Sequence, residues 1–138
     1  MNCTNISNID FRSAEKIGAN AFASCESLEN AYFGEGLVEL DQRSFYKCNG
    51  LKEVEFADGS MMGKSISEEA FRGSGIQKLV IGEGCRTIES KAFYECDSLK
   101  KIVMPDSLRE IKDLAFASVG SNCLSSLELG NGLKSIGN

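Results

Sequence analysis

The stretch KAFYECDSLKKIVMPDSLREI, residues 91–111, places apolar residues at intervals that fit neither a helical period of about 3.6 nor the alternation of a strand. Its pattern recurs along the chain every 22 to 26 residues, marked by a phenylalanine. The marker column consists of Phe22, Phe45, Phe71, Phe93 and Phe116, each preceded five residues earlier by Ile or Leu. Apolar residues around a whole repeat can be buried only by neighbouring repeats, so each unit is predicted to be one coil of a solenoid.

Two short extended segments are predicted in each coil. The L-x-x-V-x-F segment alternates inward and outward and is followed by turn residues such as Gly-Glu-Gly, which is typical of a strand. One such strand per coil would build a parallel sheet. The I-x-x-x-A-F segment predicts a second short extended piece, and A-F-x-x-C a helical turn or an irregular corner. The insertions at 60–63 and 120–122 account for the unequal repeat lengths.

The repeating template I-x-x-x-A-F-x-x-C-x-x-L-x-x-I-x-[FIM]-[GP] resembles the BspA-like leucine-rich repeats, also called the Treponema pallidum type. The resemblance implies an α/β repeat solenoid over residues 1–138: a right-handed coil with a short parallel strand in each repeat and a mostly irregular or short helical opposite side. We expect a single domain of about five and a half repeats, forming a segment of a longer array. Ser44, Ser74 and Val119 depart from the template without changing this expectation.

Composition restricts the partners and the location. The net charge of −5 and the lack of a basic run argue against nucleic acid as a partner. No apolar stretch approaches the ~18 residues of a membrane helix, so no membrane insertion is expected. The resemblance implies an extracellular or cell-surface location. The first residues lack the features of a signal peptide, which leaves a cytoplasmic location or a targeting segment outside this chain as alternatives. Asn2-Cys3-Thr4 and Asn5-Ile6-Ser7 match the glycosylation sequon, which matters only on a eukaryotic secretory route.

Six cysteines raise the question of disulfides or metal binding. Cys3, Cys25, Cys48 and Cys96 share one repeat column, and Cys85 replaces a leucine of the template. Column membership favours buried free thiols that pack as small apolar groups, with a disulfide as the alternative. Zinc is disfavoured because the chain has no histidine and no C-x-x-C pair, and no cofactor is expected. Cys123 has no clear column: local packing is expected, although it is the best candidate for a reactive thiol. The redox state of Cys85 and Cys123 does not follow from the sequence.

The residues offer little for catalysis. The absence of histidine removes the commonest general base and the usual partner of Ser and Cys nucleophiles. The carboxylate pairs Glu68 with Glu69 and Glu53 with Glu55 are interpreted as solvated surface residues. The chain is therefore predicted not to be an enzyme.

The outward strand positions predict a binding surface. Lys78 and Lys101 flank Val80 and Val103, which places an apolar spot beside positive charge, and Tyr32 supplies an aromatic anchor on the same face. The alternative is that the two valines reflect β-propensity alone.

Three functional hypotheses follow. The leading one is a non-enzymatic, adhesin-like protein–protein interaction module whose ligand, by resemblance, is a host, matrix or neighbouring-cell protein. A structural spacer that holds another domain is the alternative, and an enzyme with a Cys nucleophile is third. Because neither end of the array shows a polar capping unit, end-to-end self-association is also expected to be possible.

Overall fold

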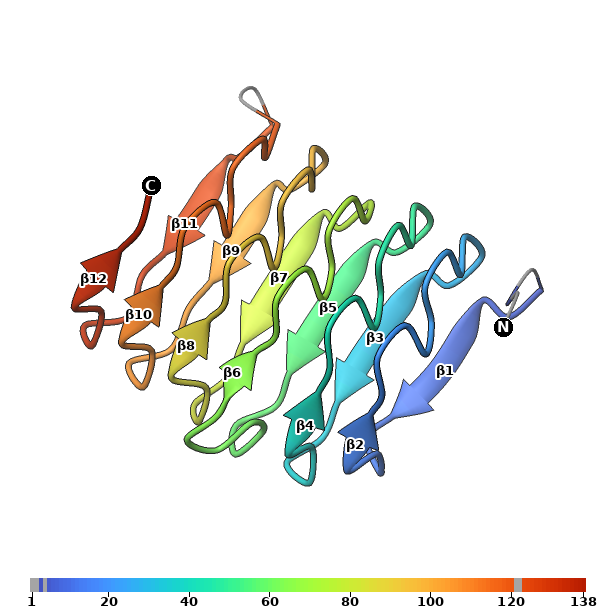
Figure 1. Cartoon of the computed structure of the whole chain (residues 1–138), viewed down its shortest axis with the longest axis horizontal. Coiled ribbons are helices and arrows are strands. Elements are labelled where there is room, and N and C mark those ends of the chain that lie inside the picture. The colour runs from blue at the N-terminus through green and yellow to red at the C-terminus, as the bar shows by residue number, and fades with distance from the viewer. Residues whose placement is uncertain (1–2, 4, 121–122) are drawn as a thin grey trace.

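The computed structural model describes residue 3, residues 5–120 and residues 123–138, and it shows a stack of coils (Figure 1). In the described residues each coil contributes a longer strand on one side and a two-residue strand on the other. Part of the first sequon, Asn2 and Thr4, and residues 121–122 of the second predicted insertion lie outside the described residues.

The longer strands form one parallel sheet, as predicted. They are β1 (Asn8–Phe11), β3 (Asn30–Phe33), β5 (Glu53–Phe56), β7 (Lys78–Ile81), β9 (Lys101–Val103) and β11 (Ser126–Glu128). The sheet has six strands in the order β1-β3-β5-β7-β9-β11. Its register follows the repeat columns, since Val54 pairs with Leu79 and Leu79 with Ile102. All three of these side chains are buried, because alternate residues of each strand face the core.

The predicted second extended piece is also present, on the opposite side of the coils. It consists of β2 (Lys16–Ile17), β4 (Glu39–Leu40), β6 (Ser65–Ile66), β8 (Thr87–Ile88), β10 (Glu110–Ile111) and β12 (Ser135–Ile136). These strands form two parallel sheets, β2-β4 and β12-β10-β8-β6. The break between the two sheets falls at the predicted insertion, residues 60–63, which lies between β5 and β6.

The phenylalanine column forms a continuous stack through the core. Consecutive ring centroids, from Phe22 to Phe116, are 5.1 to 5.3 Å apart, and consecutive rings are within 3° to 11° of parallel. The three middle rings, Phe45, Phe71 and Phe93, are fully buried, whereas the two end rings are half-buried. Each inner ring is thus covered by the coils on both sides, as the repeat pattern predicts.

The helical turn considered for the A-F-x-x-C corner is not observed, and the described residues contain no helix. In each corner the residues two before and two after the marker phenylalanine have φ of 54° to 68°, the left-handed region. The amides of the first four marker phenylalanines donate to carbonyls of the next coil, for example Phe71 N to Ala92 O at 2.8 Å. Because a helix needs negative φ and bonds within its own segment, this corner cannot be helical. The side predicted to be irregular or helical therefore consists of irregular segments and short strands. The predicted α/β class is corrected to an all-β solenoid.

Burial is confirmed for the cysteines that belong to repeat columns, and all six cysteines are free thiols. The Cys48 thiol donates a hydrogen bond to Phe22 O at 3.0 Å, and the Cys96 thiol donates to Phe71 O at 3.2 Å. These thiols pair with carbonyls of the preceding coil. Cys123 is exposed, so the local packing expected for it is wrong.

Replacing Ser44 by alanine is expected to stabilise the protein by about 1 kcal/mol. Ser44 is fully buried, and its Oγ has no hydrogen-bond partner within the described part of the chain. The template has alanine at this position, so the methyl side chain fits without loss of packing. Urea unfolding followed by circular dichroism would measure the change.

The matched control is Ser74→Ala. Ser74 Oγ donates to Phe71 O at 2.6 Å, so the same substitution there is expected to destabilise. If Ser44→Ala also lowered stability, its hydroxyl would have a partner that this account lacks.

Candidate functional site

Four of the five predicted binding residues lie together on the outward face of the six-stranded sheet. Lys78 and Val80 stand on β7, directly beside Lys101 and Val103 on β9, because the register pairs lysine with lysine and valine with valine. All four side chains are half-buried. The two valines form an apolar spot, with the two lysines next to it on the same strands.

Tyr32 lies on the same face but two strands away, on β3. The strand between them, β5, carries Glu53 and Glu55. The Tyr32 hydroxyl donates a hydrogen bond to Glu53 Oε2 at 3.1 Å, and Lys78 Nζ lies 3.9 Å from the same oxygen. Glu53 therefore connects the tyrosine to the lysine pair. It was absent from the predicted site, although it occupies the same outward column as Lys78 and Lys101.

Tyr32 borders two shallow hollows on this face. One of about 310 Å³ is bordered by Asp10, Arg12 and Tyr32, and another of about 350 Å³ by Tyr32, Glu35 and Glu55. Partial burial raises the pKa of Tyr32, and the hydrogen bond to the Glu53 carboxylate raises it further. The phenol therefore stays protonated at neutral pH and remains a hydrogen-bond donor.

The charges on this face change sign along the stack. Asp10, Glu53 and Glu55 lie toward the N-terminal end, Lys78 and Lys101 follow on β7 and β9, and Glu128 on β11 is acidic again. Each of the two lysines makes a long ion pair: Lys78 with Glu53, and Lys101 Nζ with Glu128 Oε1 at 3.6 Å. More than 40% of each lysine side chain is exposed, so these ion pairs contribute little to the stability of the fold.

The buried thiols are chemically inert. Burial raises the pKa of Cys48 to about 12, and that of Cys85 and Cys96 to about 11. Such thiols are protonated at neutral pH, and the thiolate is the nucleophile. They therefore serve packing.

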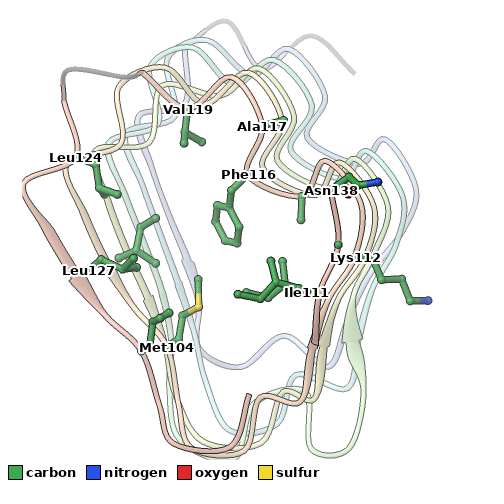
Figure 2. Close-up of a pocket in the computed structure, with 14 residues that line it drawn as sticks. Met104, Ile111, Lys112, Phe116, Ala117, Val119, Leu124, Leu127 and Asn138 are labelled. Atoms are coloured by element: carbon green, nitrogen blue, oxygen red, sulfur yellow. The ribbon is translucent and has the colours of Figure 1, made fainter. Parts of the chain in front are cut away.

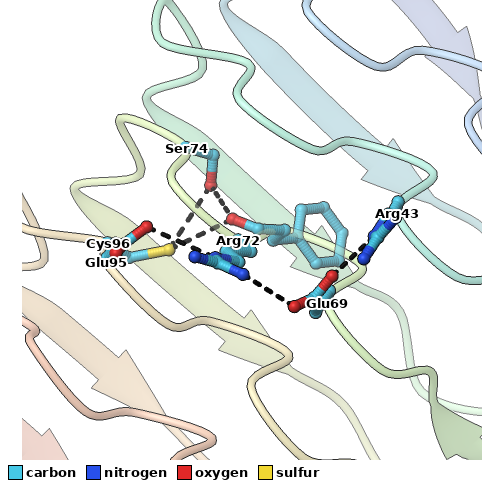
Figure 3. Close-up of polar contacts among 7 residues, drawn as sticks. Arg43, Glu69, Arg72, Ser74, Glu95 and Cys96 are labelled. Atoms are coloured by element: carbon cyan, nitrogen blue, oxygen red, sulfur yellow. Dashed lines mark hydrogen bonds and ion pairs between the residues drawn. The ribbon is translucent and has the colours of Figure 1, made fainter.

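A second polar cluster lies on the irregular corner and was not predicted (Figure 3). Glu69 was interpreted as a solvated residue, and this is wrong because only 5% of it is exposed. Its carboxylate accepts hydrogen bonds from Arg43 Nε at 2.5 Å and Arg72 Nη1 at 2.8 Å. Arg72 also donates to Glu95 Oε2 at 3.3 Å and lies over the Tyr94 ring, 5.0 Å from its centroid. These contacts join three successive coils, which indicates a structural role.

The described part of the chain contains no helix with the length and apolar character needed to cross a bilayer.

Comparisons with solved structures agree with this architecture. A leucine-rich cell surface protein from Faecalibacterium prausnitzii A2-165 is 27% identical with a TM-score of 0.74, over 83% of this chain and 29% of that protein. The T. pallidum leucine-rich repeat protein is 20% identical with a TM-score of 0.57, over 96% of this chain and 71% of the other. A leucine-rich repeat protein from Bacteroides ovatus ATCC 8483 is 20% identical with a TM-score of 0.52, over 92% and 38% of the two chains. The chain thus spans under a third of the length of the Faecalibacterium protein.

No curated protein matched the sequence. The family model described as BspA type leucine rich repeat region matches residues 1–63 and 64–138 with six copies of the repeat. The coils, the phenylalanine stack and this match lead to one conclusion: the chain belongs to the BspA-type leucine-rich repeat family.

Proposed function

We propose that this chain is a non-enzymatic, adhesin-like module that binds a protein ligand at a cell surface. The contact surface comprises Tyr32, Lys78, Val80, Lys101 and Val103, with Glu53 added from the structure. The observation that carries the proposal is the half-buried, outward-facing pair Val80 and Val103 beside Lys78 and Lys101 on one sheet face. Apolar area bordered by charge is the usual composition of a protein interface.

The rigidity of the face supports this role. The strands that carry the contact residues are tied to their neighbours in register, and their inward residues Val54, Leu79 and Ile102 are buried in the core. A surface that is ordered before binding loses little conformational entropy when a partner docks. The sheet face is therefore better suited to binding than an irregular loop would be.

The comparisons support the class of protein and the location. The family consists of leucine-rich repeat proteins, which commonly serve in protein interaction and are not generally enzymes. The Faecalibacterium relative is described as a cell surface protein, which favours the same location here. The ligand would be a host, matrix or neighbouring-cell protein with acidic groups around an apolar centre, to complement the lysines and valines.

A binding assay with matched charge reversals tests the proposal. A panel of purified extracellular-matrix proteins would be passed over the immobilised chain, and the dissociation constant of any binder measured by interferometry. Lys78→Glu combined with Lys101→Glu should weaken that binder at least tenfold, because it places carboxylates against the acidic partner. Lys47→Glu combined with Lys64→Glu changes the net charge equally at exposed positions off this face and should have little effect.

Two outcomes would contradict the proposed site. Equal weakening by both charge-reversal pairs would show non-specific attraction by net charge. Binding that survives Lys78→Glu, Lys101→Glu and Tyr32→Ala would place the contact elsewhere. If no protein of the panel binds, the regular stack is better explained as a spacer that separates other domains.

A further inference from the structure

The outward face of the six-stranded sheet is longer along the stack than along its strands. The longest strands, such as β7, have four residues, which corresponds to about 13 Å. Six parallel strands at a spacing of about 4.8 Å extend the face to about 24 Å along the stack. Figure 2 shows the inward side, where Leu127 and Met104 point into the space that the coils enclose. The outward side is therefore a strip whose width fits one α-helix, since a helix with its side chains is about 10 to 12 Å across.

The charge of this face changes sign twice between β5 and β11. Glu53 and Glu55 stand on β5, β7 and β9 each carry one lysine and one valine, and Glu128 stands on β11. The register aligns these side chains from strand to strand. We call the outward side chains of these four strands the outward strip. A partner lying along the outward strip meets negative, positive, positive and negative charge in turn, with apolar contacts on the two middle strands.

The acidic start of the outward strip borders an open hollow that fits a basic side chain. Glu55 and Tyr32 are register partners on adjacent strands, and both border the hollow of about 350 Å³ together with Glu35. Arg12 also borders it, with its guanidinium 3.9 Å from the Asp10 carboxylate. Among the described residues neither Glu35 nor Glu55 has an ion-pair partner. An arginine of a partner would meet two such carboxylates beside an aromatic ring, both of which suit a guanidinium group.

We propose that the element of the protein ligand that docks on the outward strip is an amphipathic α-helix lying across the strands, along the stack. This inference rests on the proposed function, because it concerns the same contact surface. A helix rises about 5.4 Å per turn, close to the strand spacing of about 4.8 Å, so successive turns lie over successive strands. An extended peptide would place its same-face side chains about 6.7 Å apart and would fall out of step with the strands.

Charge complementarity gives the sequence pattern of this helix. One face carries a basic residue at the first turn, an acidic and an apolar residue at each of the next two turns, and a basic residue at the fourth. The acidic residues pair with Lys78 and Lys101, and the apolar residues cover Val80 and Val103. The first basic residue enters the hollow beside Tyr32.

Two synthetic peptides of identical composition, each held helical by a hydrocarbon staple, test the inference. The matched peptide carries arginine, glutamate, glutamate and arginine at four successive turns, and the inverted peptide carries glutamate, arginine, arginine and glutamate. Both have leucine at the two middle turns. Fluorescence anisotropy should show that the parent chain binds the matched peptide at least tenfold more tightly, because the inverted peptide sets like charges against each other.

A variant with both ion pairs exchanged provides the matched control. It combines Glu53→Lys with Lys78→Glu and Lys101→Glu with Glu128→Lys, which keeps the two ion pairs and the net charge but inverts the pattern. This variant should prefer the inverted peptide, and circular dichroism would verify that it folds. In the parent chain Glu55→Gln should weaken the matched peptide severalfold, whereas Glu26→Gln, at an exposed position off this face, should have little effect.

The outcomes separate this inference from the proposed function. Equal affinity of the two peptides, the same preference in parent chain and exchanged variant, or no binding of the matched peptide at millimolar concentration would overturn the helical partner. If a panel protein is nevertheless lost on Lys78→Glu combined with Lys101→Glu, the proposed contact surface stands without a helical ligand. Discrimination between the peptides without any binder in the panel would support the helix and count against the matrix ligand.

Discussion

Replacing Phe71 by alanine is expected to lower the free energy of unfolding by about 3 to 5 kcal/mol, the cost of removing a large buried aromatic ring. Phe71 is fully buried, and its ring stacks on Phe45 at 5.1 Å and on Phe93 at 5.2 Å. Truncation therefore removes contacts with two neighbouring coils and leaves a cavity between them. Urea unfolding of the variant and the parent chain, followed by circular dichroism, would measure the difference.

Phe116→Ala serves as the control. Phe116 is half-buried and has one stacked neighbour, Phe93, at 5.1 Å, so its loss should cost clearly less. The larger loss of stability at Phe71 is expected because coils on both sides bury its ring, whereas the Phe116 ring is covered on one side. Equal costs at both positions, or a cost below about 1 kcal/mol for Phe71→Ala, would contradict the stacked core.

Glu69→Gln is expected to destabilise the protein by about 2 kcal/mol at neutral pH, the usual contribution of hydrogen bonds to a charged group. Glu69 is buried and accepts hydrogen bonds from Arg43 and Arg72, which become unpaired from their counter-ion when the carboxylate is replaced. Bonds to charged groups of this kind contribute more than neutral ones. The two arginines retain contact with water, which keeps the cost below that of a fully buried pair.

The same carboxylate predicts a pH dependence. Burial by itself raises the pKa of Glu69, but the hydrogen bonds from Arg43 and Arg72 outweigh it, so the pKa lies below the ordinary value of 4.5. A lowered pKa in the folded state contributes stability above pH 4.5 that is lost as the pH falls through the folded pKa. The difference in unfolding free energy between the parent chain and Glu69→Gln should therefore be largest at pH 7 and smaller at pH 3.

Unfolding in urea at both pH values would measure this change. Glu95→Gln is the control. Glu95 accepts one longer hydrogen bond from Arg72 and is partly exposed, so loss of its charge should change the unfolding free energy little at either pH. A Glu69→Gln effect that is equal at pH 7 and pH 3 would show that the ion pairs are not its cause.

The repeat columns of the sequence predicted the larger part of the fold. Spacing alone aligned Phe45, Phe71 and Phe93, and these rings stack as expected. The same columns placed Lys78 beside Lys101 on the outward face, and the sheet register agrees. This success has a physical reason: in a solenoid one register relates every coil to the next, so a single alignment determines many contacts.

The corner and its ion pairs could not be predicted. Left-handed φ usually indicates glycine or asparagine, yet here Arg43, Glu69 and Lys91 adopt it. Hydrogen bonds to the next coil hold this backbone, and residue type does not reveal them. The burial of Glu69 follows from the same corner, since its two arginines come from different coils.

The sequence also did not predict the difference in side-chain exposure between the first and last coils. Phe11 and Leu129 occupy equivalent columns, but the inward turn of the Phe11 ring depends on the neighbouring Phe22 and Phe45 rings. Among the described residues no coil packs against the outer side of Leu129, and that side chain is half exposed. The template describes a coil with neighbours on both sides and says little about a coil with one.

Contacts between successive phenylalanine rings in solution test the central claim most directly. Nuclear Overhauser spectra with selectively labelled phenylalanine should show cross-peaks from Phe45 to Phe71 and from Phe71 to Phe93, whose centroids are 5.1 and 5.2 Å apart. The stacked-coil account predicts these sequential cross-peaks together with slow amide exchange at Phe71, whose N–H donates to the next coil. Rings without mutual cross-peaks, and a Phe71 amide that exchanges as fast as in an unfolded chain, would contradict it.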